Sequence, residues 1–183
     1  MKKLLLFDVD GTLVDTEGAG LSSLQSGIYK AFPEKKSTPF PSLDLGGATD
    51  GNVVSFLFGH FQLKVSRENE EVFFQCYLSA MTETLNSYQA EGKGRCLAGV
   101  IPLLDALAKE PDRWSLALLT GNIAAGAKAK LQHYGLAHYF SFGAYGDDHS
   151  DRNALGPIAL KRATVDNGME FAPEDALIIG ATP

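Results

Sequence analysis

Two aspartates at the end of the first apolar segment have the types and spacing for chemistry. Asp8 and Asp10 end the apolar run that begins at Lys3, and Gly11 follows them directly. Residues two apart on a strand share a face, and the glycine lets the chain turn so that the second carboxylate can swing beside the first. Such a pair suits a magnesium ion. It also suits a reaction in which one carboxylate attacks and the other moves protons. The same pattern is common in turns that merely end a strand.

A second polar group follows the apolar residues 115–119. It consists of Thr120, Gly121 and Asn122. A hydroxyl and the unpaired backbone N–H groups that open the next helix would form a cradle for phosphate. Thr and Asn are also good helix caps, so a purely structural role stays open at this point.

Strands and helices alternate over most of the chain. Residues 3–9, 115–119 and 176–179 are apolar runs of the kind found in strands buried on both faces of a parallel sheet, and residues 139–142 are a weaker candidate. Apolar residues at helical spacing lie between these runs: Val100, Leu103, Leu104, Leu107, Ala127, Leu131, Tyr134, Leu155, Ile158 and Ala159. The alternation predicts an α/β fold with a doubly wound parallel sheet. Because ligands bind beyond the carboxyl ends of such strands, both polar groups should meet at one edge.

Residues 16–95 interrupt this alternation with three helical patterns. The first contains Leu21, Leu24 and Ile28, and the third is preceded by Ser66, which we expect to cap its helix. We therefore divide the chain into a core of residues 1–15 and 96–183 and a helical insert of residues 16–95. The core is expected to be incomplete at its C-terminus.

The motif at residues 4–13, Leu-Leu-Leu-Phe-Asp-Val-Asp-Gly-Thr-Leu, resembles the opening motif of the haloacid dehalogenase-like hydrolase superfamily. The similarity is greatest to its phosphoglycolate-phosphatase-like branch and covers essentially the whole chain. The resemblance implies a Rossmann-like core with an inserted helical cap. It also implies that Asp8 attacks phosphorus to form an aspartyl-phosphate, while Asp10 protonates the leaving oxygen and then activates water. Magnesium would lie between the Asp8 carboxylate, the Asp10 backbone carbonyl and the phosphate.

The same resemblance implies a set of groups that hold the phosphate. They are Gly11, Thr12, Thr120, Gly121, Asn122 and Arg152. The family expects a basic residue, usually lysine, before the last helix, and Arg152 stands at about that point. Arginine can bind phosphate bidentately but is not equivalent to lysine. Lys128, Lys130 and Lys161 are competitors, each of which could instead be a solvated charge on a helix. We interpret Asp147, Asp148 and His149 as polar residues of the preceding loop.

Two segments leave questions open. In relatives, Gly-Asp and then a further Asp come after the last apolar strand. Here Gly180 precedes Ala181, and the sequence stops at Pro183. Losing these acids should weaken magnesium binding. Residues 45–51 resemble a segment that in relatives reaches over the active site and helps to select the substrate. A simple loop with Thr49 or Asp50 as the cap of the next helix is the alternative.

The amino-acid composition disfavours some classes of binding partner. The chain has 183 residues, with 22 acidic and 16 basic side chains and a net charge of −6, which argues against nucleic acid or an anionic membrane as the main partner. No segment approaches the roughly 20 apolar residues of a membrane span. Cys76 and Cys96 form no metal or redox motif. We expect a cytoplasmic protein, a monomer or small homo-oligomer, with a small phosphorylated metabolite as its partner.

These observations predict a magnesium-dependent phosphomonoester hydrolase. One alternative is a phosphomutase that uses the same nucleophile. Another is a catalytically impaired relative that binds phosphate or protein, which Ala181 favours. A dehalogenase is disfavoured because Asp10 would have no task in that reaction. Neither the phosphate-binding loop of nucleoside triphosphatases nor a dinucleotide-binding glycine motif follows the first strand.

Overall fold

The computed structural model describes residues 2–43 and 45–180. Four parallel strands form the central sheet in the order β5–β4–β1–β6. They are β1 (Lys3–Phe7), β4 (Trp114–Leu119), β5 (Gly143–Ala144) and β6 (Ala176–Ile179). Strand β1 pairs with β4 on one side, where Leu5 lies opposite Leu116, and with β6 on the other. The predicted α/β fold with a parallel sheet is confirmed.

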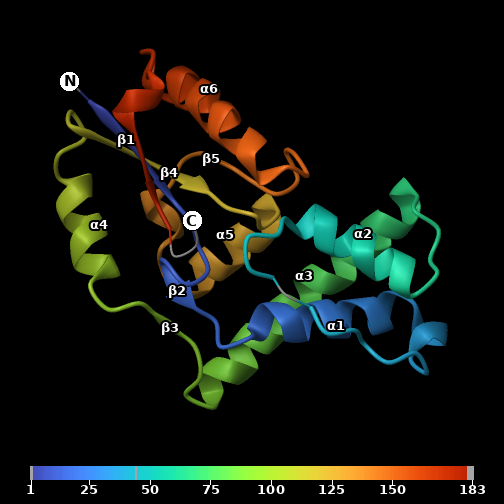
Figure 1. The fold of residues 1–183 in the computed structure, drawn as a ribbon. Coiled ribbons are helices and arrows are strands. Elements are labelled where there is room, and N and C mark those ends of the chain that lie inside the picture. The colour runs from blue at the N-terminus through green and yellow to red at the C-terminus, as the bar shows by residue number, and fades with distance from the viewer. Residues whose placement is uncertain (1, 44, 181–183) are drawn as a thin grey trace.

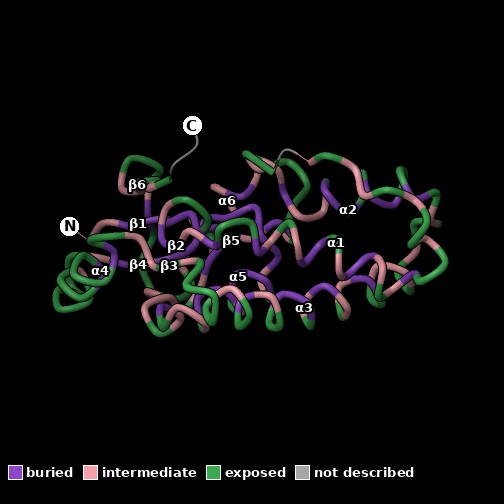
Figure 2. The backbone as a smooth tube through the Cα atoms, turned by 90° about the horizontal axis from the view of Figure 1, so that it is seen from below, coloured by how far each residue is buried: buried purple, intermediate pink, exposed green. Residues whose placement is uncertain are grey.

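Helices cover both faces of this sheet (Figure 1). Alternate residues of β1 enter different clusters: Leu5 and Phe7 pack with α4 (Val100–Ala108) and α5 (Ala124–His133), whereas Leu4 and Leu6 pack with α6 (Leu155–Asn167). Figure 2 shows the buried backbone running through the middle of the molecule along β1 and β4. This double burial explains why β1 is a continuous apolar run rather than an alternating one.

Two features of the sheet differ from the expectation. Residues 139–142 do not form a strand, because Ala137–Tyr139 is a 3-10 turn and the strand β5 comes later and is only two residues long. The glycine at its first position packs its backbone against Leu118, which leaves no room for a side chain. On the opposite edge, β6 exposes 53% of Leu177 and 69% of Ile178.

Three helices of the described residues between positions 16 and 95 gather to one side of the sheet (Figure 1). They are α1 (Ala19–Ala31), α2 (Asp50–His60) and α3 (Arg67–Ala90), and aliphatic and aromatic residues both contribute to the apolar cluster between them. Thr49 and Ser66 cap α2 and α3, each accepting a hydrogen bond from a backbone N–H three residues on, as predicted for Ser66. The division of the chain at residues 15 and 96 stays a prediction.

A two-stranded antiparallel ribbon lies where the chain enters and leaves this helical segment. It pairs β2 (Val14–Asp15) with β3 (Arg95–Cys96). The Arg95 guanidinium donates to the Asp15 carboxylate at 2.9 Å and lies 3.6 Å from Glu17. The two crossings are therefore tied together by backbone and side chains. None of the helices among the described residues is long and apolar enough to cross a bilayer.

Replacing Gly27 with alanine should destabilise the protein. Gly27 is buried where α1 crosses α3, and an added Cβ would lie 2.8 Å from the Tyr77 Cα. Because backbone atoms cannot yield cheaply, we expect the free energy of unfolding to fall by about 1–3 kcal/mol. Denaturant-induced unfolding measures this. Gly59→Ala on α2 is the matched control, since a Cβ added there would have nothing within 4 Å. Equal stability of the two variants would contradict the close packing of α1 on α3.

Candidate active site

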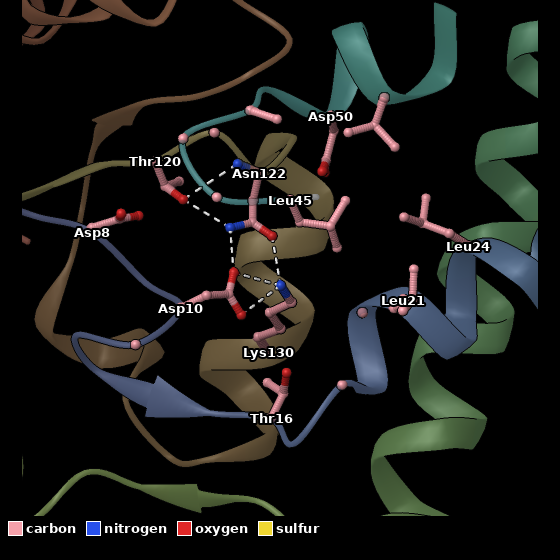
Figure 3. Close-up of a pocket in the computed structure, with 18 of the residues that line it drawn as sticks. Asp8, Asp10, Thr16, Leu21, Leu24, Leu45, Asp50, Thr120, Asn122 and Lys130 are labelled. Atoms are coloured by element: carbon pink, nitrogen blue, oxygen red, sulfur yellow. Dashed lines mark hydrogen bonds and ion pairs between the residues drawn. The ribbon is translucent and has the colours of Figure 1, made fainter. Parts of the chain in front are cut away.

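A cavity of about 360 Å³ lies beyond the carboxyl ends of β1 and β4. Most of the residues predicted to act on phosphate line it: Asp8, Asp10, Gly11, Thr120, Gly121, Asn122 and Arg152. The side of the cavity away from the sheet is formed by α1, the loop before α2 and the start of α2 (Figure 3). Residues far apart in the sequence therefore meet at the edge of the sheet where parallel α/β folds bind ligands.

The Asp8 carboxylate is held at the end of β1 from two directions. One oxygen, Oδ1, accepts the backbone N–H of Val9 at 2.8 Å, and Oδ2 accepts Nη2 of Arg152 at 2.5 Å. The Asp8 backbone N–H itself donates to the carbonyl of Ile179 on β6 at 2.9 Å. Asp8 is only 8% exposed, yet its side chain lines the cavity. A buried carboxylate with fixed orientation and one open approach is suited to attack an electrophile.

Arg152 reaches Asp8 from the 3-10 turn η3 (Arg152–Ala154), directly before α6. Asp151 fixes this turn, because its carboxylate accepts the N–H of Asn153 at 3.0 Å. The Arg152 side chain is 30% exposed and lines the same cavity. The guanidinium has further N–H donors that could bind phosphate oxygens while one remains on Asp8. The structure thus brings Arg152 to the position that its spacing suggested.

Lys130 is the most buried charged side chain of the site among the described residues. Its ammonium donates to both carboxylate oxygens of Asp10, at 2.8 and 2.7 Å, and to Oδ1 of Asn122 at 2.7 Å. Its side chain is 5% exposed, whereas that of Asp10 is 44% exposed and reaches the cavity. Lysine has three donors, so all three are used here. The interpretation of Lys130 as a solvated charge is therefore wrong, although it holds for the exposed Lys128 and Lys161.

Asn122 connects this ion pair to Thr120 (Figure 3). Its Nδ2 donates to Asp10 Oδ2 and to Thr120 Oγ1, both at 2.8 Å, and its backbone N–H reaches the same hydroxyl oxygen at 3.3 Å. Thr120 is completely buried and lines the cavity. Because its oxygen accepts these bonds, its own O–H can donate toward a ligand. Thr120 and Asn122 are thus more than a helix cap.

Helical spacing contained a signal for Lys130. The buried positions of α5 are Gly126, Ala127, Lys130 and Leu131, which form one stripe at intervals of one, three and four residues. Lys130 falls on the stripe that Ala127 and Leu131 define, while Lys128 falls outside it. A lysine on an apolar stripe needs a buried acceptor, and that requirement could have singled it out.

Other expectations for the loops have mixed outcomes. The Thr12 side chain does not line the cavity, and its buried Oγ1 has no hydrogen-bond partner among the described residues. Its predicted place in the phosphate cradle therefore needs correction. The turn is closed by backbone hydrogen bonds, in which the N–H of Gly11 donates to the Val14 carbonyl and that of Thr12 to the Val9 carbonyl. Asp147 and Asp148 do stabilise the structure, by accepting the N–H of Ala124 at 3.1 Å and the guanidinium of Arg162 at 2.5–2.7 Å.

The loop before α2 closes the cavity from the other side. Thr49 Oγ1 donates to the carbonyl of Ser150 at 3.1 Å, and the Asp50 backbone N–H donates to the Gly121 carbonyl at 2.8 Å. A Cβ on Gly121 would collide with the Ala48 carbonyl. The absence of a side chain at position 121 therefore allows the loop to approach the end of β4 this closely. The predicted substrate-selecting segment lies over the site and also begins a helix, with Thr49 as its cap.

The Asp50 carboxylate joins the helical segment to the core. Its Oδ2 accepts the N–H of Ile123, at the start of α5, at 2.9 Å. Burial raises the pKa of the Asp50 carboxyl, although the Ile123 N–H and the charge of Lys130 oppose this rise. Asp50 therefore contributes an acid, and no cation, to the wall of the cavity.

The donors for a metal ion are few. No group of three His, Cys, Asp or Glu side chains that could hold a metal is present in residues 2–43 and 45–180. Asp8 and Asp10 are the two carboxylates at the cavity floor, and both oxygens of Asp10 already accept hydrogen bonds from Lys130 and Asn122. Ala181, where relatives carry an acid, lies outside the described residues. Magnesium often binds proteins through one or two carboxylates and completes its shell with water and substrate phosphate, and this donor set fits such a weak site.

Comparison with known proteins identifies the family. The sequence profile of haloacid dehalogenase-like hydrolases matches residues 5–180. This chain belongs to that family. It is 33% identical over 151 residues to the probable phosphatase IndB of Dickeya dadantii (strain 3937). That match covers 76% of this chain but 57% of IndB, so the chain spans little more than half the length of this curated relative.

Solved structures of the haloacid dehalogenase-like family share the fold. One is a predicted phosphoglycolate phosphatase from Haemophilus somnus 129pt, with a TM-score of 0.62 and 19% identity, over 98% of this chain and 76% of that one. Another is the magnesium-bound hydrolase YfnB from Bacillus subtilis, with a TM-score of 0.56 and 19% identity, over 98% of this chain and 79% of that one. The predicted superfamily and its Rossmann-like fold are confirmed. The roles of the individual site residues remain predictions.

Lys130→Met should destabilise the protein by about 1–3 kcal/mol, because Asp10 and Asn122 would lose a buried donor. The comparison of denaturant-induced unfolding for this variant and the wild type measures the effect. Lys128→Met, on the exposed side of the same helix, should change the free energy of unfolding by less than about 0.5 kcal/mol. A similar effect of both substitutions would contradict a structural role for the Lys130 ammonium.

Asp50→Asn should change how stability depends on pH. Because burial raises the folded-state pKa of Asp50, the protonated carboxyl is favoured in the folded chain. The protonated Asp50 carboxyl makes its full contribution to the free energy of unfolding below the unfolded-state pKa. This contribution is lost as the pH rises through the higher folded-state pKa. Relative to Asp50→Asn, the wild type should therefore lose stability as the pH rises above the unfolded-state pKa of an aspartate, about 3.9. Unfolding measured at several pH values tests this, and a wild type that gains stability relative to the variant would contradict it.

Proposed function

We propose that this chain is a phosphomonoester hydrolase in which Asp8 is the nucleophile. The observation that carries the proposal is the setting of the Asp8 carboxylate at the end of β1. It is buried, oriented by Val9 and Arg152, and open to a cavity that Thr120 also lines. The matching profile supports a hydrolase, and the name of the relative IndB supports a phosphatase among the hydrolases.

The residues of the cavity allow a two-step reaction. In the first step an oxygen of Asp8 forms a bond to phosphorus, the bond from phosphorus to the ester oxygen breaks, and the leaving oxygen takes a proton from the protonated Asp10. In the second step water attacks phosphorus, Asp10 takes a proton from that water, and the bond from phosphorus to Asp8 breaks. Free alcohol and inorganic phosphate are the products, and both aspartates return to their starting state.

The surrounding groups would stabilise the charge on the phosphoryl oxygens. The Arg152 guanidinium can bind these oxygens, and the Thr120 hydroxyl can donate to another. Lys130 and Asn122 hold the Asp10 carboxylate in one orientation beside the cavity. Donors fixed before the substrate arrives lose little energy to reorganisation during the reaction.

We also propose that magnesium binds with the substrate, through the Asp8 carboxylate and the Asp10 backbone carbonyl. When bound, it would neutralise charge on the phosphate and reduce its repulsion of Asp8. The magnesium-bound structure of YfnB and the donor set on the cavity floor support this assignment. The small number of carboxylate ligands among the described residues favours weak binding that depends on the substrate phosphate.

Asp8→Asn should abolish hydrolysis, because an amide oxygen cannot attack phosphorus in place of the carboxylate. We expect phosphate release from p-nitrophenyl phosphate with added magnesium to fall by at least about 10³-fold. Asp112→Asn is the control, since Asp112 is exposed and lies outside the cavity. Comparable turnover by Asp8→Asn and wild type would refute the assignment of the nucleophile. No turnover by the wild type with any phosphomonoester would instead favour the alternative of a module that binds phosphate without hydrolysing it.

A further inference from the structure

The cavity has two chemically different halves. Its floor, at the sheet, holds the charged groups Asp8, Asp10, Lys130 and Arg152. The opposite wall is lined by leucines, because Leu21 and Leu24 of α1 and Leu45 of the loop before α2 all face the cavity (Figure 3).

The leucine wall offers apolar surface to a ligand. Leu21 and Leu45 are each 38% exposed, and both line the cavity. Apolar surface in a concave site gains free energy when an apolar group of a ligand covers it. Tyr77 also contributes to the lining, and burial raises the pKa of its phenol well above the usual value, so this side chain is uncharged at neutral pH.

The basic side chains that line the cavity lie on its floor, next to the sheet. Lys130 and Arg152 are the two basic side chains among the described residues that line the cavity, and they are bound to Asp10 and Asp8. A phosphate group would occupy Arg152. A second anionic group of the substrate would then face the leucines and the acid Asp50 without a cationic partner, and the burial of an unpaired charge is unfavourable.

We infer that the substrate is a phosphate monoester of an uncharged, largely apolar alcohol or phenol, with no second anionic group. This inference rests on the proposed function, because it places the phosphate of the ester at Asp8 and Arg152. The ester's carbon skeleton then lies against Leu21, Leu24 and Leu45. Phosphoglycolate, which carries a carboxylate, and hexose bisphosphates, which carry a second phosphate, are disfavoured by the same wall.

Two esters of the same size test the inference. Isobutyl phosphate and 2-phosphoglycolate have equal numbers of non-hydrogen atoms, but the first ends in two methyl groups and the second in a carboxylate. With the wild type and magnesium, we expect kcat/KM for isobutyl phosphate to exceed that for 2-phosphoglycolate by at least about tenfold. Equal rates, or a preference for 2-phosphoglycolate, would overturn the inference while leaving the hydrolase assignment intact.

A positive charge placed on the leucine wall should weaken this preference. Leu21→Lys adds an ammonium at a position that is already partly exposed, so we expect it to fold and to lower the ratio of the two kcat/KM values by at least about tenfold. Leu103→Lys is the matched control, because Leu103 is 46% exposed on α4 and does not line the cavity. An unchanged ratio in Leu21→Lys would count against the leucine wall as the selecting surface.

Binding separates the inference from the proposed hydrolysis. Calorimetric titration of the wild type with each ester requires no turnover. Tighter binding of isobutyl phosphate without hydrolysis would overturn the proposed function and support the assigned ligand class. Hydrolysis of both esters together with tighter binding of 2-phosphoglycolate would support the proposed function and overturn the assigned ligand class.

Discussion

The buried ammonium of Lys130 is the interaction on which the geometry of the site depends. It comes from α5 but binds Asp10, which follows β1, and Asn122, which follows β4. An unpaired ammonium at this depth would be strongly unfavourable, so α5 and both strand ends must adopt positions that supply its three acceptors. Asn122 extends the same set of hydrogen bonds to Thr120. The elements that carry the reactive groups are therefore fixed to one another by charge and hydrogen bonding as well as by apolar packing.

The helical segment completes the site by close contact rather than by a large interface. The loop before α2 contacts the end of β4 at Gly121, where a side chain would collide, and Asp50 bonds to the start of α5. The same contacts place Leu45 and the leucines of α1 opposite the Asp8 carboxylate (Figure 3). In the proposed function, the groups that react with phosphate and the leucines that select the substrate therefore lie on opposite walls of one cavity. Sequence changes on α1 could alter the preferred leaving group without disturbing the floor.

Much of this could be predicted from the sequence because strong local patterns coincide with the fold. Strands β1, β4 and β6 are apolar runs, and Asp8, Asp10 and Thr120 stand at strand ends, where the topology brings them together. Prediction from the sequence fails for elements that have no local sequence pattern. Strand β5 and the ribbon of β2 and β3 are only two residues long, so no periodicity can develop in them.

The charged residues show a different limit of sequence interpretation. Lys130 and Lys128 lie two positions apart on one helix, yet one is buried against Asp10 and the other is exposed. The apolar stripe of α5 separates the two lysines, but only the three-dimensional structure shows which groups accept the hydrogen bonds of Lys130. Likewise, Thr12 belongs to a recognisable motif, but it is not among the residues that line the cavity. Motifs predicted which segments form the site better than they predicted which side chains face the ligand.

The most direct test of the central claim is to trap the phosphorylated residue. The protein would be quenched with acid during turnover of a phosphomonoester and reduced with tritiated borohydride, which converts an aspartyl-phosphate to labelled homoserine. Peptide mapping should find that label at position 8, and only when substrate was present. Turnover that leaves position 8 unlabelled, or that labels another residue, would contradict the role of Asp8 as the nucleophile.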